Sequence, residues 1–234
     1  MKGHPLFEDD KLHAESEIYE LKSDIYDKYS KAEDVPNKIA NFMIPLIKDK
    51  VVLDFGCGTG KFIPKLAPLS KIYWAIDISN NQLKIARKKV KNHKNVKIVQ
   101  NSINKIPLES NSVDIVFASW VIGSIHNLKL REKTINEIKR VVKKENSIYI
   151  IENNIGGEYK EVIEEGYGDE KTEIKLKWFE DNGFKRVKSF KTYFEFEDLE
   201  SARKIFGSIF GEEITSKIKN KKILHNIIIY KNEE

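Results

Sequence analysis

Apolar and polar positions along the chain follow two periods in turn, one typical of strands and one typical of helices. Short apolar runs rich in β-branched residues predict buried strands at residues 51–53, 72–76, 96–100, 113–118 and 147–151. Helical spacing between these runs predicts helices at residues 62–68, 80–91 and 128–143. Alternating units of this length predict an α/β fold, with a doubly wound, mostly parallel sheet covered on both faces.

Two further helices are predicted ahead of the first strand. Residues 12–31 carry apolar side chains at spacings of three and four, at Ile18, Leu21, Ile25 and Tyr29. A second helix starts after Asp34, a candidate cap, with Pro36 in its first turn. We expect these two helices to form a helical cap ahead of the sheet.

The pattern after residue 172 differs from the regular alternation before it. It predicts a helix through Trp178, a turn at Gly183, a strand over residues 187–196 and a last strand over residues 223–230. An amphipathic helix is predicted between these two strands, over residues 199–209.

A glycine-rich turn follows the first strand, where Asp54 is succeeded by Gly56, Gly58 and Gly60. Glycines there let the backbone approach a ligand closely, and the helix that follows offers free N–H groups. A dinucleotide fingerprint needs a third glycine where Lys61 stands, and a P-loop needs Ser or Thr where Phe62 stands. The turn therefore fits neither of these nucleotide motifs.

The turn resembles motif I of the class I S-adenosylmethionine (SAM) dependent methyltransferases, since it reads D-x-G-x-G-x-G. The resemblance implies that the glycines pass the amino-acid end of the cofactor and that Asp54 acts at its ammonium side. The alternative is a glycine-rich turn that binds no ligand.

A second acidic residue, Asp77, ends the next predicted strand about 20 residues after the turn. A carboxylate at this place can accept hydrogen bonds from two ribose hydroxyls. Asp77 with Ile78 and Ser79 resembles motif II of the same family. Taken alone, Asp77 has the alternative role of a turn or helix-capping residue.

The resemblance implies further cofactor contacts at the ends of later strands. Asn101, Ser102 and Ile103 fall where the family meets adenine, although Asn101-Ser102 departs from the commoner Asp-Ala pair. Ser119 and Trp120 fall beside the methyl group. Aromatic rings can attract a sulfonium, so Tyr19, Tyr26 and Tyr29 of the cap are candidates for contacts between the lid and the cofactor. The alternative for each tyrosine is ordinary packing of the helix.

His126 is the histidine placed where a general base could act, because this side chain ordinarily titrates near neutral pH. The alternative to a general base is that His126 is a loop residue that only packs or makes hydrogen bonds. Glu152, which ends the fifth strand, is expected either to touch substrate or to cap the loop that follows it at residues 153–157. Asp114 lies at the far end of its strand, which indicates a structural role.

The family fold is a Rossmann-like, seven-stranded sheet that ends in an antiparallel hairpin, here with residues 198–218 inserted between the hairpin strands. We expect a single methyltransferase domain over residues 1–234. Residues 1–48 would form the cap or lid, 49–152 the cofactor-binding core, and 153–234 the substrate side with the hairpin.

Composition fits an enzyme of this kind. The 234 residues are 40% hydrophobic and 33% charged, with a net charge of +5 spread along the chain. The single cysteine, Cys57, leaves neither a disulfide framework nor a multi-cysteine metal site. No apolar run is long enough to span a bilayer and no signal-peptide core is present, so a cytoplasmic location is expected. Metal independence is expected because no metal-ligand cluster appears in the sequence.

The acceptor is open at this stage. The resemblance implies in-line transfer of the methyl group, leaving S-adenosylhomocysteine (SAH), and a good nucleophile needs little acid–base help. A small-molecule acceptor is favoured because no appended domain is visible and the cap is aromatic. An RNA or protein methyltransferase and a non-catalytic SAM-binding regulatory protein are the alternatives.

Overall fold

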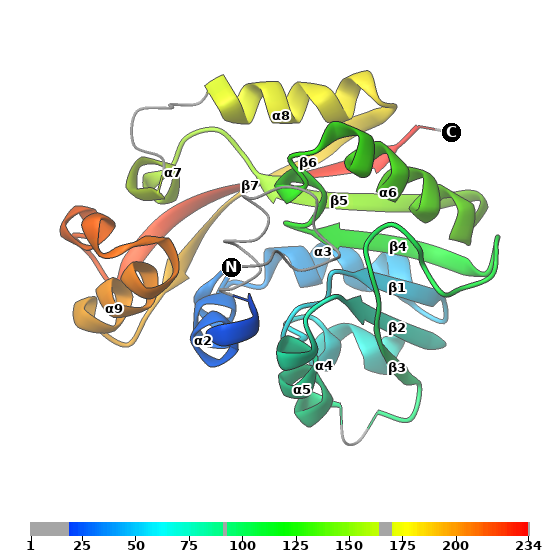
Figure 1. Cartoon of the computed structure of the whole chain (residues 1–234), viewed down its shortest axis with the longest axis horizontal. Helices are drawn as coiled ribbons and strands as arrows, with labels where there is room; N and C mark the ends of the chain where they lie inside the picture. Colours follow the sequence, from blue (N-terminus) through cyan, green and yellow to red (C-terminus); the bar gives the residue numbers. More distant parts are fainter. Residues whose placement is uncertain (1–18, 91–92, 164–169, 234) are drawn as a thin grey trace, which may run out of the picture.

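The computed structural model describes residues 19–90, 93–163 and 170–233, and places seven strands in one sheet of order β3-β2-β1-β4-β5-β7-β6 (Figure 1). The strands are β1 (Val51–Phe55), β2 (Ile72–Asp77), β3 (Val96–Gln100), β4 (Val113–Ser119), β5 (Val142–Asn153), β6 (Phe184–Glu195) and β7 (Lys222–Asn232). β1 to β5 pair in parallel, whereas β7 is antiparallel to both of its neighbours, β5 and β6. The Rossmann-like fold with an antiparallel C-terminal hairpin is confirmed.

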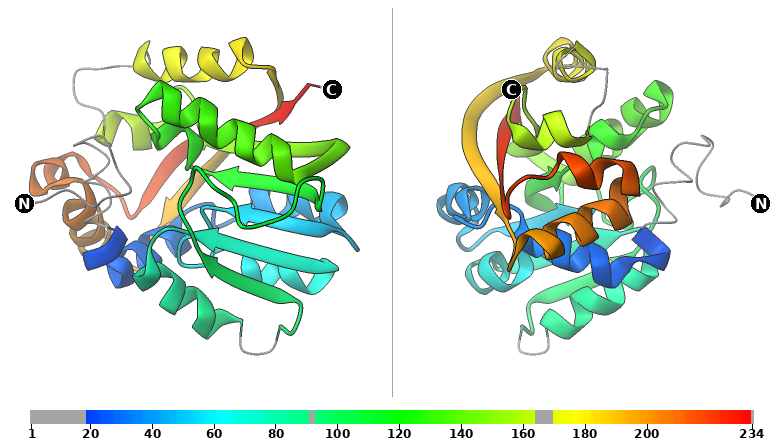
Figure 2. Two further views of the ribbon diagram at one scale, coloured as in Figure 1. Left: turned by 45° about the vertical axis from the view of Figure 1, so that its right-hand side comes forward. Right: turned by 90° about the vertical axis from the view of Figure 1, so that its left-hand side faces the viewer.

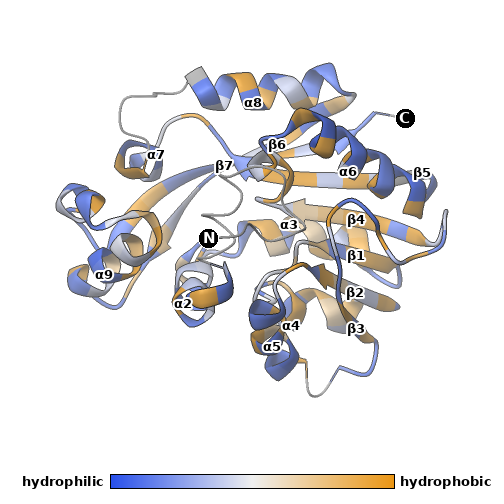
Figure 3. Ribbon diagram, in the orientation of Figure 1, coloured by the Kyte–Doolittle hydropathy of each residue, from blue (hydrophilic) through white to orange (hydrophobic). Residues whose placement is uncertain are grey.

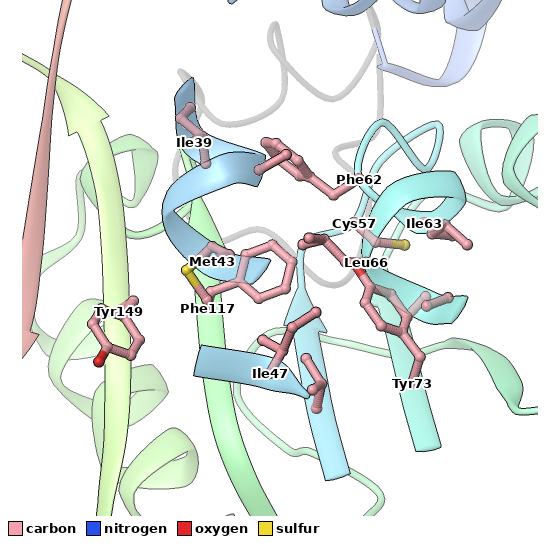
Figure 4. Close-up of a cluster of buried hydrophobic side chains, with 14 of the residues drawn as sticks. Ile39, Met43, Ile47, Cys57, Phe62, Ile63, Leu66, Tyr73, Phe117 and Tyr149 are labelled. Atoms are coloured by element: carbon pink, nitrogen blue, oxygen red, sulfur yellow. The ribbon is translucent and has the colours of Figure 1, made fainter. Parts of the chain in front are cut away.

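One face of the sheet packs against three helices that precede or follow β1 and β2. These are α3 (Lys38–Ile47), α4 (Ile63–Leu66) and α5 (Asn80–Lys89). Figure 4 shows Met43 and Ile47 of α3 beside Phe117 of β4, with Phe62 and Tyr73 in the same cluster. Phe62 and Tyr73 both contact the Phe117 ring, with centroids 5.7 and 6.4 Å away.

The opposite face packs against α6 (Leu128–Val141) and α8 (Glu170–Asp181). Successive residues of β7 show how the sheet supplies both cores. Ile227 and Ile229 belong to the cluster under α3, whereas Ile228 and Tyr230 belong to the cluster under α8. In Figure 3 the central strands are largely hydrophobic, whereas α6 and α8 carry both hydrophobic and hydrophilic residues.

A third apolar cluster lies at the end of the molecule where α2 (Ser23–Ala32) and α9 (Leu199–Phe210) run side by side (Figure 2). It also includes α7 (Glu158–Ile163) and the 3-10 segment η3 (Glu212–Lys217). Tyr29, Phe194 and Phe206 pack ring against ring inside it. The insertion predicted between the hairpin strands is thus α9 and η3, and it packs against the cap.

Several element bounds differ from the prediction. Residues 12–18 of the first predicted helix lie outside the described residues, and α2 covers the rest only from Ser23. β5 is longer than predicted, and α7 was not predicted. The second helix begins later than predicted, because α3 starts at Lys38, with Asn37 at its N-cap position and Pro36 in the turn before it. Asp34 still caps this helix from the preceding turn, since its two carboxylate oxygens accept from the backbone N–H groups of Lys38 and Ile39 at 3.1 and 2.9 Å.

Candidate cofactor and acceptor site

A pocket opens at the carboxyl ends of β1, β2 and β4, the edge at which sheets of this kind bind ligands. Its floor comes from the glycine turn, from the end of β2 and from the segment after β4. Its roof comes from the residues at the start of α2 and just before it. Of the residues predicted to bind a cofactor, the pocket is lined by Gly56, Gly58, Asp77, Ile78, Asn101, Ile103, Ser119 and Trp120.

The glycine turn has no room for side chains. Gly56, Gly58 and Gly60 all have positive φ, of 72°, 55° and 78°. A Cβ on Gly56 would lie 2.1 Å from Val121 Cγ2, and one on Gly58 would lie 2.7 Å from Gln82 Oε1. Gly60 does not line the pocket but lies against α5. The first two glycines therefore bring bare backbone to the pocket.

Asp77 is held by the backbone around it. One carboxylate oxygen accepts from the Gly58 N–H at 2.8 Å and the other from the Ser79 N–H at 2.9 Å. Each oxygen keeps a second lone pair, since a carboxylate has about four acceptor sites. Burial raises the pKa of Asp77, against these hydrogen bonds, which lower it. The side chain thus lines the pocket with unused acceptor capacity.

Asp54 lies inside the sheet and does not line the pocket. Its carboxyl group is 1% exposed and accepts a hydrogen bond from the Tyr73 hydroxyl at 2.8 Å. Burial raises its pKa to about 7. The structure thus gives the Asp54 carboxyl group no direct access to the pocket, and its role at the ammonium side of the cofactor stays a prediction.

The end of β4 supplies a hydroxyl and an indole. Ser119 Oγ is buried and has no hydrogen-bond partner among the described residues, so its bonding capacity is available to a ligand. Trp120 has a φ of 58°, which is rare for a bulky residue. Its indole N–H donates to Asn153 Oδ1 at 2.7 Å, and Lys61 Nζ lies 5.2 Å from the ring centroid.

The roof is formed by Tyr19, Glu20 and Tyr26. The backbone carbonyls of Tyr19 and Glu20 accept from the Ser79 hydroxyl at 3.3 Å and from the Asn81 amide at 2.8 Å, which ties the roof to α5. Tyr29, by contrast, is 7% exposed and lies in the third apolar cluster, outside the pocket. Of the three tyrosines predicted as lid contacts, the structure places two at the pocket.

The loop after β4 is anchored by Glu152. Its Oε1 accepts from the Gly123 N–H at 2.8 Å, and its Oε2 pairs with Lys175 Nζ at 3.2 Å. Arg131 Nε donates to the Ile125 carbonyl at 2.8 Å from the other side. Glu152 therefore anchors the loop after β4, and not the loop at residues 153–157 that it was predicted to cap, and it does not line the pocket.

Other predicted residues lie apart from the pocket. Ser102 does not line it, and His126 is exposed on the loop before α6, outside the lining. Asp114 accepts from the Val51 N–H at 2.8 Å and pairs with Lys143 at 2.7 Å, which fits its structural role. Gln82 and Glu20 also line the pocket, and they were not predicted because neither belongs to a motif.

The lining is apolar with a negative component. Glu20 and Asp77 are its only ionisable carboxylates, and no lysine or arginine lines it within the part of the chain that the structure describes. Over the same residues, no three His, Cys, Asp or Glu side chains gather as metal ligands, and no helix is long and apolar enough to cross a membrane.

The family described as methyltransferase domain matches residues 53–150. An uncharacterized protein of Methanocaldococcus jannaschii is 33% identical over 188 residues, which cover 73% of this chain and 78% of that protein. The ubiquinone/menaquinone biosynthesis C-methyltransferase UbiE of Campylobacter jejuni is 31% identical over 114 residues, 46% of each chain, so the match spans about half of that enzyme.

A solved structure shares the fold over most of both chains. The crystal structure of a SAM dependent methyltransferase from Aquifex aeolicus superposes with a TM-score of 0.59 and 23% identity, and covers 90% of this chain and 97% of that one.

Proposed function

This chain belongs to the class I SAM-dependent methyltransferases, and we propose that it transfers the methyl group to a small-molecule acceptor bound beneath the start of α2. The observation that carries the proposal is the aromatic enclosure of the pocket, with Trp120 in one wall and Tyr19 and Tyr26 in the roof. An acceptor under such a roof has to be small enough to be enclosed.

The residues present fit SAM. Gly56 and Gly58 leave space beside the backbone that a Cβ would fill. Asp77 offers spare carboxylate lone pairs to ribose hydroxyls, and Ser119 offers a buried hydroxyl with no partner among the described side chains. The acidic lining favours a ligand that carries positive charge. We assign Asn101 and Ile103, which line the same pocket, to the adenine end.

Bound SAM supplies a methyl group already activated on a sulfonium. The work left to the chain is therefore to align the acceptor and to exclude water. The Trp120 and Tyr26 rings provide the apolar walls for both tasks. We assign no proton transfer to His126, because its side chain is exposed and outside the pocket lining.

The acceptor class has support from one relative. UbiE is by its name a C-methyltransferase of ubiquinone and menaquinone biosynthesis, and its match covers 46% of this chain. In this proposal the acceptor is likewise a small organic molecule, with an apolar or aromatic part that packs against the tyrosines and the indole.

Calorimetric titration with SAH tests the cofactor site. Asp77→Ala removes the proposed ribose acceptor, and the loss of a charge-assisted hydrogen bond is worth about 1.5–3 kcal/mol, or about 10- to 150-fold in Kd. Asp181→Ala, at an exposed carboxylate of α8, is the matched control and should leave Kd unchanged. Equal affinity in the two variants would refute the assignment of Asp77.

Activity assays then separate the alternatives. Turnover of SAM to SAH with a small-molecule pool, unaffected by RNA, is the expected result. RNA-dependent turnover with a steep dependence of affinity on salt would favour an RNA methyltransferase instead. SAM binding without turnover across small molecules, RNA and protein would favour a regulatory protein.

A further inference from the structure

Two buried polar side chains, Glu33 and His225, and the half-buried Asn153 form a group behind the Trp120 wall of the pocket. Glu33 comes from the end of α2, Asn153 from the end of β5 and His225 from the middle of β7. Glu33 is 5% exposed and His225 is fully buried. Neither lines the pocket, and the function proposed above uses neither of them.

The hydrogen bonds of this group fix where the protons are. An indole N–H is only a donor, so the Asn153 atom 2.7 Å from Trp120 Nε1 is the amide oxygen. The same oxygen lies 2.9 Å from His225 Nε2. Since an amide oxygen only accepts, His225 Nε2 carries a hydrogen, and in the neutral ring Nδ1 holds a lone pair.

That lone pair faces another acceptor. His225 Nδ1 lies 3.5 Å from Glu33 Oε1 and makes no hydrogen bond with any described residue. The other oxygen of Glu33 accepts from Lys61 Nζ at 3.0 Å. Two buried acceptors that face each other repel unless a proton lies between them. The arrangement is therefore complete only with one shared proton.

The charges around the pair agree with this. Burial raises the pKa of Glu33 to about 7, with Lys61 opposing the rise and Asp34 adding to it. Burial lowers the pKa of His225 to about 3, with Lys61 and Lys160 of α7 contributing. The pair is otherwise surrounded by rings, those of Tyr26, Tyr29, Tyr159, Phe194 and Trp120.

We propose that Glu33 and His225 share one proton and, through Asn153, hold the Trp120 indole in place as the wall of the acceptor pocket. They are positioning residues, because they act through the indole. The left-handed backbone of Trp120 needs such support, since strained conformations persist only where their surroundings impose them. The imidazole also stacks beside the indole, with centroids 6.2 Å apart and planes at 25°.

This inference rests on the proposed function only where it places the acceptor beside Trp120. Its test therefore measures a signal of the Trp120 indole itself. The chain has three tryptophans, and incorporation of 5-fluorotryptophan gives each a ¹⁹F signal, which single Trp→Phe substitutions assign. In the wild-type protein we expect the Trp120 signal to titrate with a midpoint near pH 7, where Glu33 loses the shared proton.

Three variants make the test specific. Glu33→Gln should abolish the titration, whereas Glu173→Gln, at an exposed glutamate of α8, should leave it intact. His225→Phe keeps a ring but removes the hydrogen bond to Asn153, and it should shift the Trp120 signal at every pH. His225→Gln places an amide N–H near the position of Nε2, and it should restore the signal toward that of the wild type.

A Trp120 signal that does not titrate between pH 6 and 8, or that still titrates in Glu33→Gln, would overturn the proposal. The same samples should be titrated with SAH by calorimetry. Failure of the wild-type protein to bind SAH would refute the cofactor site instead, and it would not alter the ¹⁹F result. The two proposals can thus fail separately.

Discussion

Gly56→Ala tests whether the close approach of the glycine turn to Val121 shapes the pocket. The φ of Gly56 is 72°, and a left-handed backbone costs an alanine about 1–2 kcal/mol. The added Cβ would also lie 2.1 Å from Val121 Cγ2, so the turn or the loop after β4 has to move. Forcing an extra carbon into a packed site costs about 1–3 kcal/mol.

Gly183→Ala is the matched control. Gly183 has a similar φ of 82°, but a Cβ there would meet nothing within 4 Å. The control therefore pays only the backbone strain, about 1–2 kcal/mol, whereas Gly56→Ala should lose about 2–5 kcal/mol. Equilibrium unfolding in urea, followed by circular dichroism, measures both losses.

A double variant isolates the contact itself. Val121→Ala removes both γ carbons that the new Cβ would meet, so Gly56→Ala with Val121→Ala should be more stable than the sum of the single losses predicts. SAH affinity should fall in Gly56→Ala and stay unchanged in Gly183→Ala, which is outside the pocket lining. Equal losses of stability in the two glycine variants, with no coupling to Val121, would refute this reasoning.

Two other substitutions test buried carboxylates. In the folded state burial raises the pKa of Asp54 from 3.8 to about 7, so between these two pH values folded Asp54 binds more protons than unfolded Asp54, and its contribution to stability falls as the pH rises. Asp54→Asn should therefore gain up to about 4 kcal/mol of stability relative to the wild type between pH 4 and pH 7, measured by urea unfolding at each pH. A difference in stability that stays constant with pH would contradict the raised pKa. Glu152→Ala leaves Lys175 without its buried partner and should cost about 3–5 kcal/mol, whereas Lys177→Ala, which breaks an exposed pair on the same helix, should cost less than about 1 kcal/mol in the same assay.

The sequence predicted the parts of the fold and of the site that depend on local pattern. The strands and the glycine turn follow from apolar runs and from glycine spacing, and Asp77 follows from its distance to that turn. These features were predictable because neighbouring residues determine them.

The parts that were not predicted depend on contacts between distant segments. Which tyrosine of the cap reaches the pocket is decided by how α2 packs against Phe194 and Phe206, which bury Tyr29 and leave Tyr26 at the roof. The burial of Asp54 depends on the pairing of β1 with β2, which brings the Tyr73 hydroxyl to it. No spacing within the chain encodes either contact.

The position of β7 has a consequence for the order in which the molecule can be completed during synthesis. β7 follows both β5 and β6 in the sequence, yet it lies between them and pairs with both. Until it emerges from the ribosome, β5 has an open edge, β6 has no partner, and the indole of Trp120 lacks its neighbour His225. Every residue that lines the pocket precedes β7, so the nascent chain can assemble the glycine turn and Asp77 before His225 is in place behind Trp120, and the support of that wall is completed last.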